Sequence, residues 1–135
     1  MPAITLLKGE MNCVMINEYD VLRKAVTLLD KKLALDMVAL DVSELTVLSH
    51  YFVICSGGST SQLHALSDEL KEKMGDYILR CEGTEESGWI IIDLEGVMVH
   101  IFNRQMRDYY SLEHLWEDTG RMDINELIIK EEGTK

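Results

Sequence analysis

The stretch from Trp89 to Phe102, WIIIDLEGVMVHIF, predicts a β-hairpin at the centre of the fold. Two alternating apolar runs flank Glu95-Gly96, a pair that suits a two-residue turn although it is a weaker turn signal than Asn-Gly. One face of this hairpin is wholly aliphatic and belongs to the core. Its expected cross-strand pairs are Leu94–Val97, Ile92–Val99 and Ile90–Ile101.

The other face of the hairpin is aromatic, apolar and sparsely charged. Its expected cross-strand pairs are Trp89–Phe102, Ile91–His100 and Asp93–Met98. Asp93 and His100 then lie on a diagonal, within side-chain reach. Such a face is either covered by the chain's own helix or is a docking surface, and composition leaves both open. A register slip of one residue would exchange the two faces.

Periodicities on both sides of the hairpin predict an α/β domain of the α+β-like kind. Asp20 is the expected cap of a helix with the apolar residues Leu22, Ala25, Val26, Leu29 and Leu33. Further strands are expected at 37–43, 51–55 and 78–82, and helices at 104–110, 111–116 and 122–132. The sequence therefore predicts one domain with a mixed sheet of about five strands flanked by helices.

A glycine-containing junction, SGGSTSQ at 56–62, leads from a strand into another helix. The apolar stripe of this helix consists of Leu63, Leu66, Leu70 and Met74, with Gly75 as the expected C-terminal cap. Ser59 and Gln62 fit a capping box. Such a junction either holds an anion on backbone N–H groups or is a tight turn that needs glycine. The turn is favoured, because no P-loop lysine or GxGxxG pattern is present.

Composition excludes several classes of protein. The 135 residues contain 13 basic and 24 acidic side chains, a net charge of −11 that argues against direct nucleic-acid binding. An acidic protein can still dock on basic ribosomal proteins. The three cysteines are odd in number and show no metal-ligand spacing, so reduced thiols and no cofactor or metal are expected. No secretory signal or membrane span is expected.

No catalytic set stands out, and the residues offer three possibilities. His100 would act as a general base if Asp93 oriented it, but a hydrogen-bonded structural or interface histidine is favoured. Cys55 precedes a helix N-terminus that would lower its pKa, yet a buried apolar role is the better hypothesis. A nucleotidyltransferase-like site would combine the Gly58-Ser59 turn with Asp93 and Glu95. That alternative lacks a cation at the turn to neutralise a triphosphate.

Several segments, in order, resemble the ribosomal silencing factor family, also called Iojap-like. They are DMVALDVS at 36–43, YFVI at 51–54, SGGSTSQ at 56–62, EG at 82–83, WIIID at 89–93, VHIF at 99–102 and RDYYSLEHLW at 107–116. The resemblance covers about Val21 to Asp118. One departure is His50, where the family usually has an acid before the aromatic residue. We expect an N-terminal extension at 1–19, the family domain at 20–118 and an acidic tail with a short helix at 119–135.

The resemblance implies a nucleotidyltransferase-like fold whose enzymatic site is degenerate, and hence no enzyme activity. It also implies a bacterial cytoplasmic repressor of translation that binds protein fourteen of the large ribosomal subunit. Bound there, the factor would sterically block joining of the small subunit when nutrients are short. Homodimers are reported in the family, and members in organelles act in large-subunit assembly. A self-associating assembly module therefore remains an alternative, and no membrane partner is expected.

The partner-binding residues that we expect lie on or beside the aromatic face of the hairpin. Trp89 is the expected aromatic anchor, and Asp93, with Glu82 or Glu113, is expected to meet basic residues of the partner. The other members of this expected set are His100, Phe102 and Tyr110. Arg107 and Trp116 are expected to pack the last helices instead.

Overall fold

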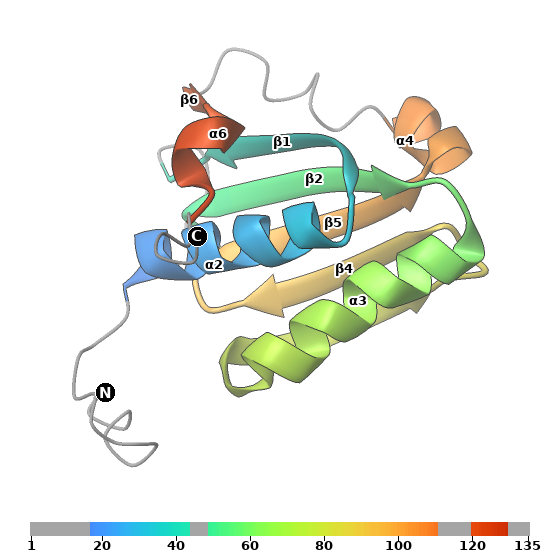
Figure 1. Cartoon of the computed structure of the whole chain (residues 1–135), viewed down its shortest axis with the longest axis horizontal. Coiled ribbons are helices and arrows are strands. Elements are labelled where there is room, and N and C mark those ends of the chain that lie inside the picture. The colour runs from blue at the N-terminus through green and yellow to red at the C-terminus, as the bar shows by residue number, and fades with distance from the viewer. Residues whose placement is uncertain (1–16, 44–48, 111–119, 130–135) are drawn as a thin grey trace.

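The computed structural model describes residues 17–43, 49–110 and 120–129. Their strands are β1 (Leu35–Asp41), β2 (Tyr51–Gly57), β3 (Ile78–Thr84), β4 (Trp89–Leu94), β5 (Val97–Asn103) and β6 (Gly120–Met122). Their helices are α2 (Glu18–Lys31), α3 (Thr60–Met74), α4 (Arg104–Tyr110), α6 (Ile124–Leu127) and the 3₁₀ turn η1 (Gly75–Tyr77). All six strands join one sheet in the order β3-β4-β5-β2-β1-β6 (Figure 1).

The sheet is mixed, which confirms the predicted fold class. Its central strands β2 and β5 run parallel, whereas the pairs β1–β2, β3–β4, β4–β5 and β1–β6 are antiparallel. The sheet has six strands where the sequence predicts about five, and β6 is the additional one. β6 places only Gly120, Arg121 and Met122 opposite β1.

One face of the sheet is covered by α2 and α3, which lie side by side across it (Figure 1). Helical spacing brings one stripe of each helix onto the aliphatic side of the strands. The resulting main core includes Leu22, Leu29, Val53, Leu66, Leu70, Ile92 and Val99. α6 joins the same side, where Arg23 donates to the Leu127 carbonyl at 3.1 Å.

A second, smaller apolar cluster lies on the opposite face of the sheet. Its buried members are Leu40, Val42, Ile54 and Phe102, and the half-buried Val38, Phe52, Trp89 and Met106 pack against them. Because both faces are apolar, the central strands are almost continuously hydrophobic, as expected for strands buried on two sides.

The hairpin has the predicted register. Trp89 lies opposite Phe102, Ile91 opposite His100 and Asp93 opposite Met98. Gly96 in its turn has φ +79°, and a Cβ there would lie 2.1 Å from Cγ of Glu18. Glycine is therefore required at the turn, and the helix side chain closes over it.

Several expected element boundaries need correction. β1 covers Leu35–Asp41 instead of 37–43, and β2 continues to Gly57 instead of ending at 55. Helix α2 begins at Glu18, and its cap is Asn17, whose side chain accepts from the Asp20 N–H at 2.9 Å. Gly75 is the C-cap of α3, as expected, although its dihedrals are right-handed and it also begins η1. The strand predicted at 78–82 extends to Thr84.

The expected helix at 122–132 is instead the end of β6 followed by the four-residue α6. Asp123 caps α6 by accepting from the Asn125 N–H at 3.0 Å. The helix expected at 104–110 is confirmed as α4. The piece expected at 111–116 lies outside the described residues. No helix of the described ranges is long and apolar enough to cross a membrane.

Candidate functional site

Four aromatic rings gather on the outer face of the hairpin and the neighbouring strand β2. Trp89 stacks on Phe102 with ring centroids 5.1 Å apart. His100 stacks on Phe102 at 6.2 Å and is tilted against Phe52 at 5.1 Å. We call this set, Trp89, Phe102, His100 and Phe52, the aromatic cluster. Phe102 is fully buried and Trp89 is half-buried, so part of the Trp89 side chain is accessible to solvent while Phe102 lies beneath it.

His100 is the buried polar member of the aromatic cluster. Its Nδ1 is 3.2 Å from Nε1 of Trp89, the donor of the indole. Only 5% of His100 is exposed, and burial lowers the pKa of its imidazole to about 4. The ring is therefore neutral at pH 7. Among the described residues, Nε2 of His100 has no hydrogen-bond partner.

The general-base hypothesis for His100 gains no support from these contacts. Asp93 forms an ion pair with Arg80, Oδ2 to Nε at 3.4 Å, while the hydrogen bond of His100 goes to Trp89. A pKa of about 4 also makes this imidazole a weak base near neutral pH. The favoured hypothesis, a hydrogen-bonded histidine at a structural or interface position, matches the geometry.

A charged strip borders the aromatic cluster along β3 and β4. Arg80 donates to Glu82 at 2.7 Å and pairs with Asp93 at 3.4 Å. The side chains of Arg80 and Glu82 are each 55% exposed. Sequence reasoning selected the two acids but missed Arg80, which leaves the strip with a net charge of −1. The available signal was the pair of opposite charges two residues apart on an edge strand.

The remaining expected residues are placed only in part. Ile91 lies between Trp89 and Asp93 on β4, and Met98 lies opposite Asp93 on β5; both are half-buried on this face. Tyr110 is the last residue of α4, and its side chain is outside the description. Glu113 lies outside the described residues. The structure thus brings Trp89, Asp93, Glu82, His100 and Phe102 onto one face.

Comparison with known proteins shows the family to which this chain belongs. The model of the family described as "Ribosomal silencing factor during starvation" matches residues 16–135. The chain belongs to the ribosomal silencing factor family. This confirms the resemblance stated from the sequence.

Two relatives align with this chain over almost their whole length. The ribosomal silencing factor of Bacillus subtilis is 35% identical over 113 residues, which is 82% of this chain and 96% of the relative. That of Halalkalibacterium halodurans is 36% identical over 116 residues, or 84% and 99%. A crystal structure from Bacillus halodurans matches with a TM-score of 0.67 at 36% identity, covering 79% of this chain and 99% of the other.

In this member of the family, the β2–α3 junction satisfies its own backbone. Ser59 Oγ accepts from the Gln62 N–H at 3.1 Å, and Gln62 Oε1 accepts from the Gly58 N–H at 2.8 Å. The Gln62 amide also donates to the Leu33 carbonyl at 2.8 Å. A Cβ on Gly57 would lie 2.9 Å from the Leu63 side chain. These contacts match the tight-turn interpretation, with two of the N–H groups that would hold an anion already engaged.

The nucleotidyltransferase alternative requires the junction and the two carboxylates to meet, and the fold keeps them apart. Gly57 is level with Asn103, whereas Tyr51 at the other end of β2 is level with Val97 beside the hairpin turn. β2 is 7 residues long, so its ends are separated by roughly 20 Å at the usual strand rise. Glu95 is exposed in the turn itself.

Other chemistry-bearing groups lie outside the aromatic cluster. Burial raises the pKa of the Cys55 thiol to about 12, which matches its expected apolar role. Arg107, expected to pack the last helices, is buried and donates to Ser56 Oγ of β2 at 2.8 Å and to the Asp36 carbonyl of β1 at 2.7 Å. Among the described residues, no group of three His, Cys, Asp or Glu side chains is placed to hold a metal ion.

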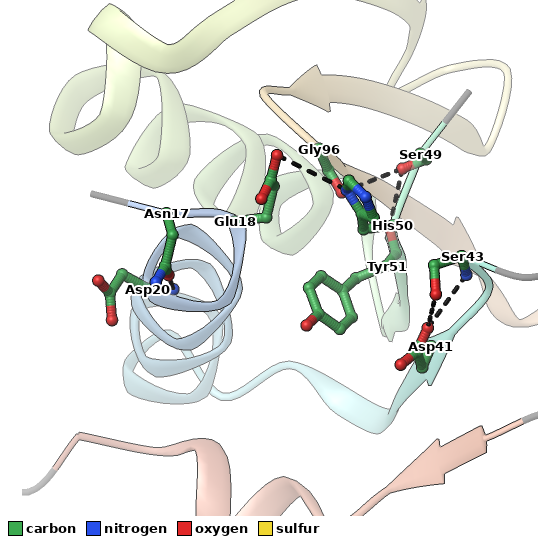
Figure 2. A network of polar contacts seen from close by, with 9 residues as sticks. All are labelled: Asn17, Glu18, Asp20, Asp41, Ser43, Ser49, His50, Tyr51 and Gly96. Carbon is green, nitrogen blue, oxygen red and sulfur yellow. Dashed lines mark hydrogen bonds and ion pairs between the residues drawn. The ribbon is translucent and has the colours of Figure 1, made fainter. Parts of the chain in front are cut away.

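His50, the departure from the family pattern, belongs to a polar network at the hairpin turn. Figure 2 shows its ring pointing toward Glu18 of α2, with Nδ1 and Oε2 3.6 Å apart. The Gly96 carbonyl accepts from the backbone N–H groups of His50 and Tyr51 at 2.9 and 3.1 Å, and from Ser49 Oγ at 3.2 Å. The turn of the hairpin is thereby tied to β2 and α2.

Proposed function

We propose that this chain binds protein fourteen of the large ribosomal subunit and sterically blocks joining of the small subunit, so that translation is repressed when nutrients are limiting. Family membership supports the ribosome-associated silencing role. The observation that carries the proposal is the half-buried Trp89, braced on buried aromatic rings and bordered by a charged strip. The site of action is then the bacterial cytoplasm.

The proposed contact residues divide into three roles. Trp89 is the anchor that enters the partner surface, and Ile91 and Met98 supply apolar area around it. Glu82 and Asp93, together with Glu113 and Tyr110, complete the contact, the acids meeting basic groups of the partner. A half-buried aromatic residue surrounded by weaker contacts is the usual composition of an interface hot spot.

His100 and Phe102 have a different role in this proposal. Both are buried, at 5% and 0% exposure, so they offer almost no area to a partner. They support the indole from beneath instead. The fixed backing reduces the conformational entropy that Trp89 loses on binding.

Steric blocking requires no reacting group, and the proposal assigns no catalytic residue or cofactor. It requires only that the chain occupy a surface that the small subunit also needs. The net charge of −11 favours encounter with a basic ribosomal protein and disfavours RNA. A homodimer through the same apolar face is the alternative occupant, and it would compete with the ribosome.

Co-sedimentation with purified large subunits tests the proposal, with joining of small subunits as the second readout. Wild-type chain should pellet with large subunits and reduce joining. Trp89→Ala should weaken binding by about 2 kcal/mol, roughly 30-fold, because it removes the anchor. Circular dichroism should be unchanged, since the indole lies at the edge of the smaller cluster.

Leu33→Ala is the matched control. Leu33 is also a large apolar residue, 74% exposed, but it lies just beyond α2, not on that helix as expected, and α2 covers the opposite face of the sheet. Its replacement should leave binding intact. Wild-type chain that neither pellets nor lowers joining contradicts the proposal, and gel filtration with and without large subunits separates ribosome binding from self-association.

A further inference from the structure

The hydrogen bond between Trp89 and His100 has only one chemically possible direction. An indole N–H donates and cannot accept, so Nδ1 of His100, 3.2 Å away, must be the acceptor. The single proton of the neutral ring is then on Nε2. Burial keeps the ring in this form, because the charged imidazolium is disfavoured among Phe52, Phe102 and Trp89.

The Nε2 atom makes histidine a destabilising residue at this core position. The Nε2 atom is buried and has no acceptor among the described residues. An unsatisfied buried donor lowers stability relative to an apolar side chain of similar volume. The position would therefore be better filled by leucine if packing were its whole purpose.

The contacts of Trp89 show what the Nδ1 atom of His100 contributes. Phe102 stacks on one side of the indole of Trp89, at a centroid distance of 5.1 Å. Stacking alone lets an aromatic ring slide and turn within its plane. The bond to Nδ1 adds a directional restraint at the indole nitrogen.

We propose that His100 is a positioning residue, whose Nδ1 holds the Trp89 indole in the orientation that the ribosomal partner binds. This rests on the proposed function, in which Trp89 is the anchor, and it adds a specific task for the buried histidine. Fixing the ring before contact lowers the entropy lost on binding. The effect on affinity is exerted through Trp89 and not through contact of His100 with the partner.

Two nearly isosteric variants separate the acceptor from the packing. In His100→Asn the amide oxygen lies close to the position of Nδ1 and can still accept from the indole, whereas His100→Leu has a similar shape and no acceptor. We expect His100→Leu to bind large subunits about 5- to 10-fold more weakly, and His100→Asn to recover most of that loss.

The free protein supplies the readout that a merely structural role would not move. The Trp89 indole N–H, assigned in ¹⁵N spectra by comparison with Trp116→Phe, should exchange faster with solvent in His100→Leu and remain protected in His100→Asn. His100→Leu should unfold at a temperature no lower than wild type, because it removes the unsatisfied donor. A purely structural histidine predicts the reverse, a less stable leucine variant.

A donor-side variant keeps the proposal testable if the leucine variant folds poorly. Trp89→Phe retains an aromatic ring but lacks the N–H, so it should weaken binding, and adding His100→Leu to it should cause little further loss. Unchanged affinity in His100→Leu, or undiminished indole protection there, overturns the proposal. A wild-type chain that does not bind large subunits overturns the proposed function instead, while the indole exchange rates still decide whether His100 holds the ring.

Discussion

His64 shows how one exposed side chain can connect two elements. It lies on α3, and its Nδ1 is 2.9 Å from Glu85 in the turn between β3 and β4. Its Nε2 is 3.1 Å from Asp68, one helical turn further along α3. The hydrogen bond to Glu85, then the charge of Asp68, raises the pKa of His64 above its ordinary value of 6.5, while Lys71 opposes the shift.

The pH dependence of this contact follows from the direction of the shift. A raised folded-state pKa means that the contribution to stability is fully present below pH 6.5 and is lost as pH rises through the folded pKa. NMR titration of the imidazole protons should therefore give His64 a pKa above 6.5. Glu85→Gln should lower it, and His64→Gln should remove this part of the pH dependence of unfolding. A wild-type value at or below 6.5 would contradict the paired geometry.

The residues of the site were predictable as far as local alternation reaches. The positions of Trp89 and His100 on one face follow from the hairpin register, which the turn residues specify. The partner of His100 did not follow, because Asp93 and Trp89 are both its diagonal neighbours across the hairpin. Arg80 decides between them by binding Asp93, and its position depends on a register shift between β3 and β4 that the sequence does not reveal.

At the scale of elements, the β2–α3 junction depends on two adjacent glycines with unequal demands. A Cβ on Gly57 would lie 2.9 Å from Leu63 Cδ2 and 3.3 Å from the Leu63 backbone nitrogen. A Cβ on Gly58 would come no nearer than 3.7 Å to Gln62 Oε1 and 3.9 Å to Leu35. The first position is therefore closed by packing and the second is open.

We expect Gly57→Ala to destabilise the fold by about 1–2 kcal/mol, because the helix start must shift to admit the methyl group. Gly58→Ala is the matched control and should change the free energy of unfolding by less than about 0.5 kcal/mol. Urea unfolding at equal slope measures both. Equal effects of the two substitutions on the free energy of unfolding would contradict the specific role given to the contact between Gly57 and Leu63.

Long elements were predicted better than short ones for a physical reason. The periodicities of α3 and the β4–β5 hairpin extend over many residues, so each carries its own pattern. β6 has 3 residues and is formed by pairing with β1, a contact that no local pattern encodes. The start of α2 was misplaced because Asn17 and Asp20 are both good capping residues, and in the structure Asn17 caps while the Asp20 N–H donates to it.

At the scale of the molecule, the charge of −11 bears on how the chain finds a partner. Attraction to a basic ribosomal protein acts mainly on association and is screened by salt. Raising ionic strength from about 50 to about 300 mM should slow association with large subunits roughly tenfold and change dissociation little. Stopped-flow or surface-based kinetics measures both rates.

The rate of association should depend on where a negative charge lies as well as on the total charge. Glu82→Gln and Glu72→Gln remove the same charge, but Glu82 lies beside the proposed anchor whereas Glu72 is exposed on α3. The first variant should slow association more than the second. Association that ignores salt, or that responds equally to both variants, would assign the charge to solubility alone.

The parallel pairing of β2 with β5 also constrains the order in which a newly made chain can mature. β2 ends at Gly57, but its central neighbour is complete only when Asn103 has been added. Until then the apolar centre of the sheet lacks a strand, and α3 can pack on only some of the strands that it contacts in the folded protein. The β4–β5 hairpin, whose contacts are local, can form as soon as both strands have emerged. Its docking beside β2 is therefore the late step that brings the two halves of the chain together during synthesis.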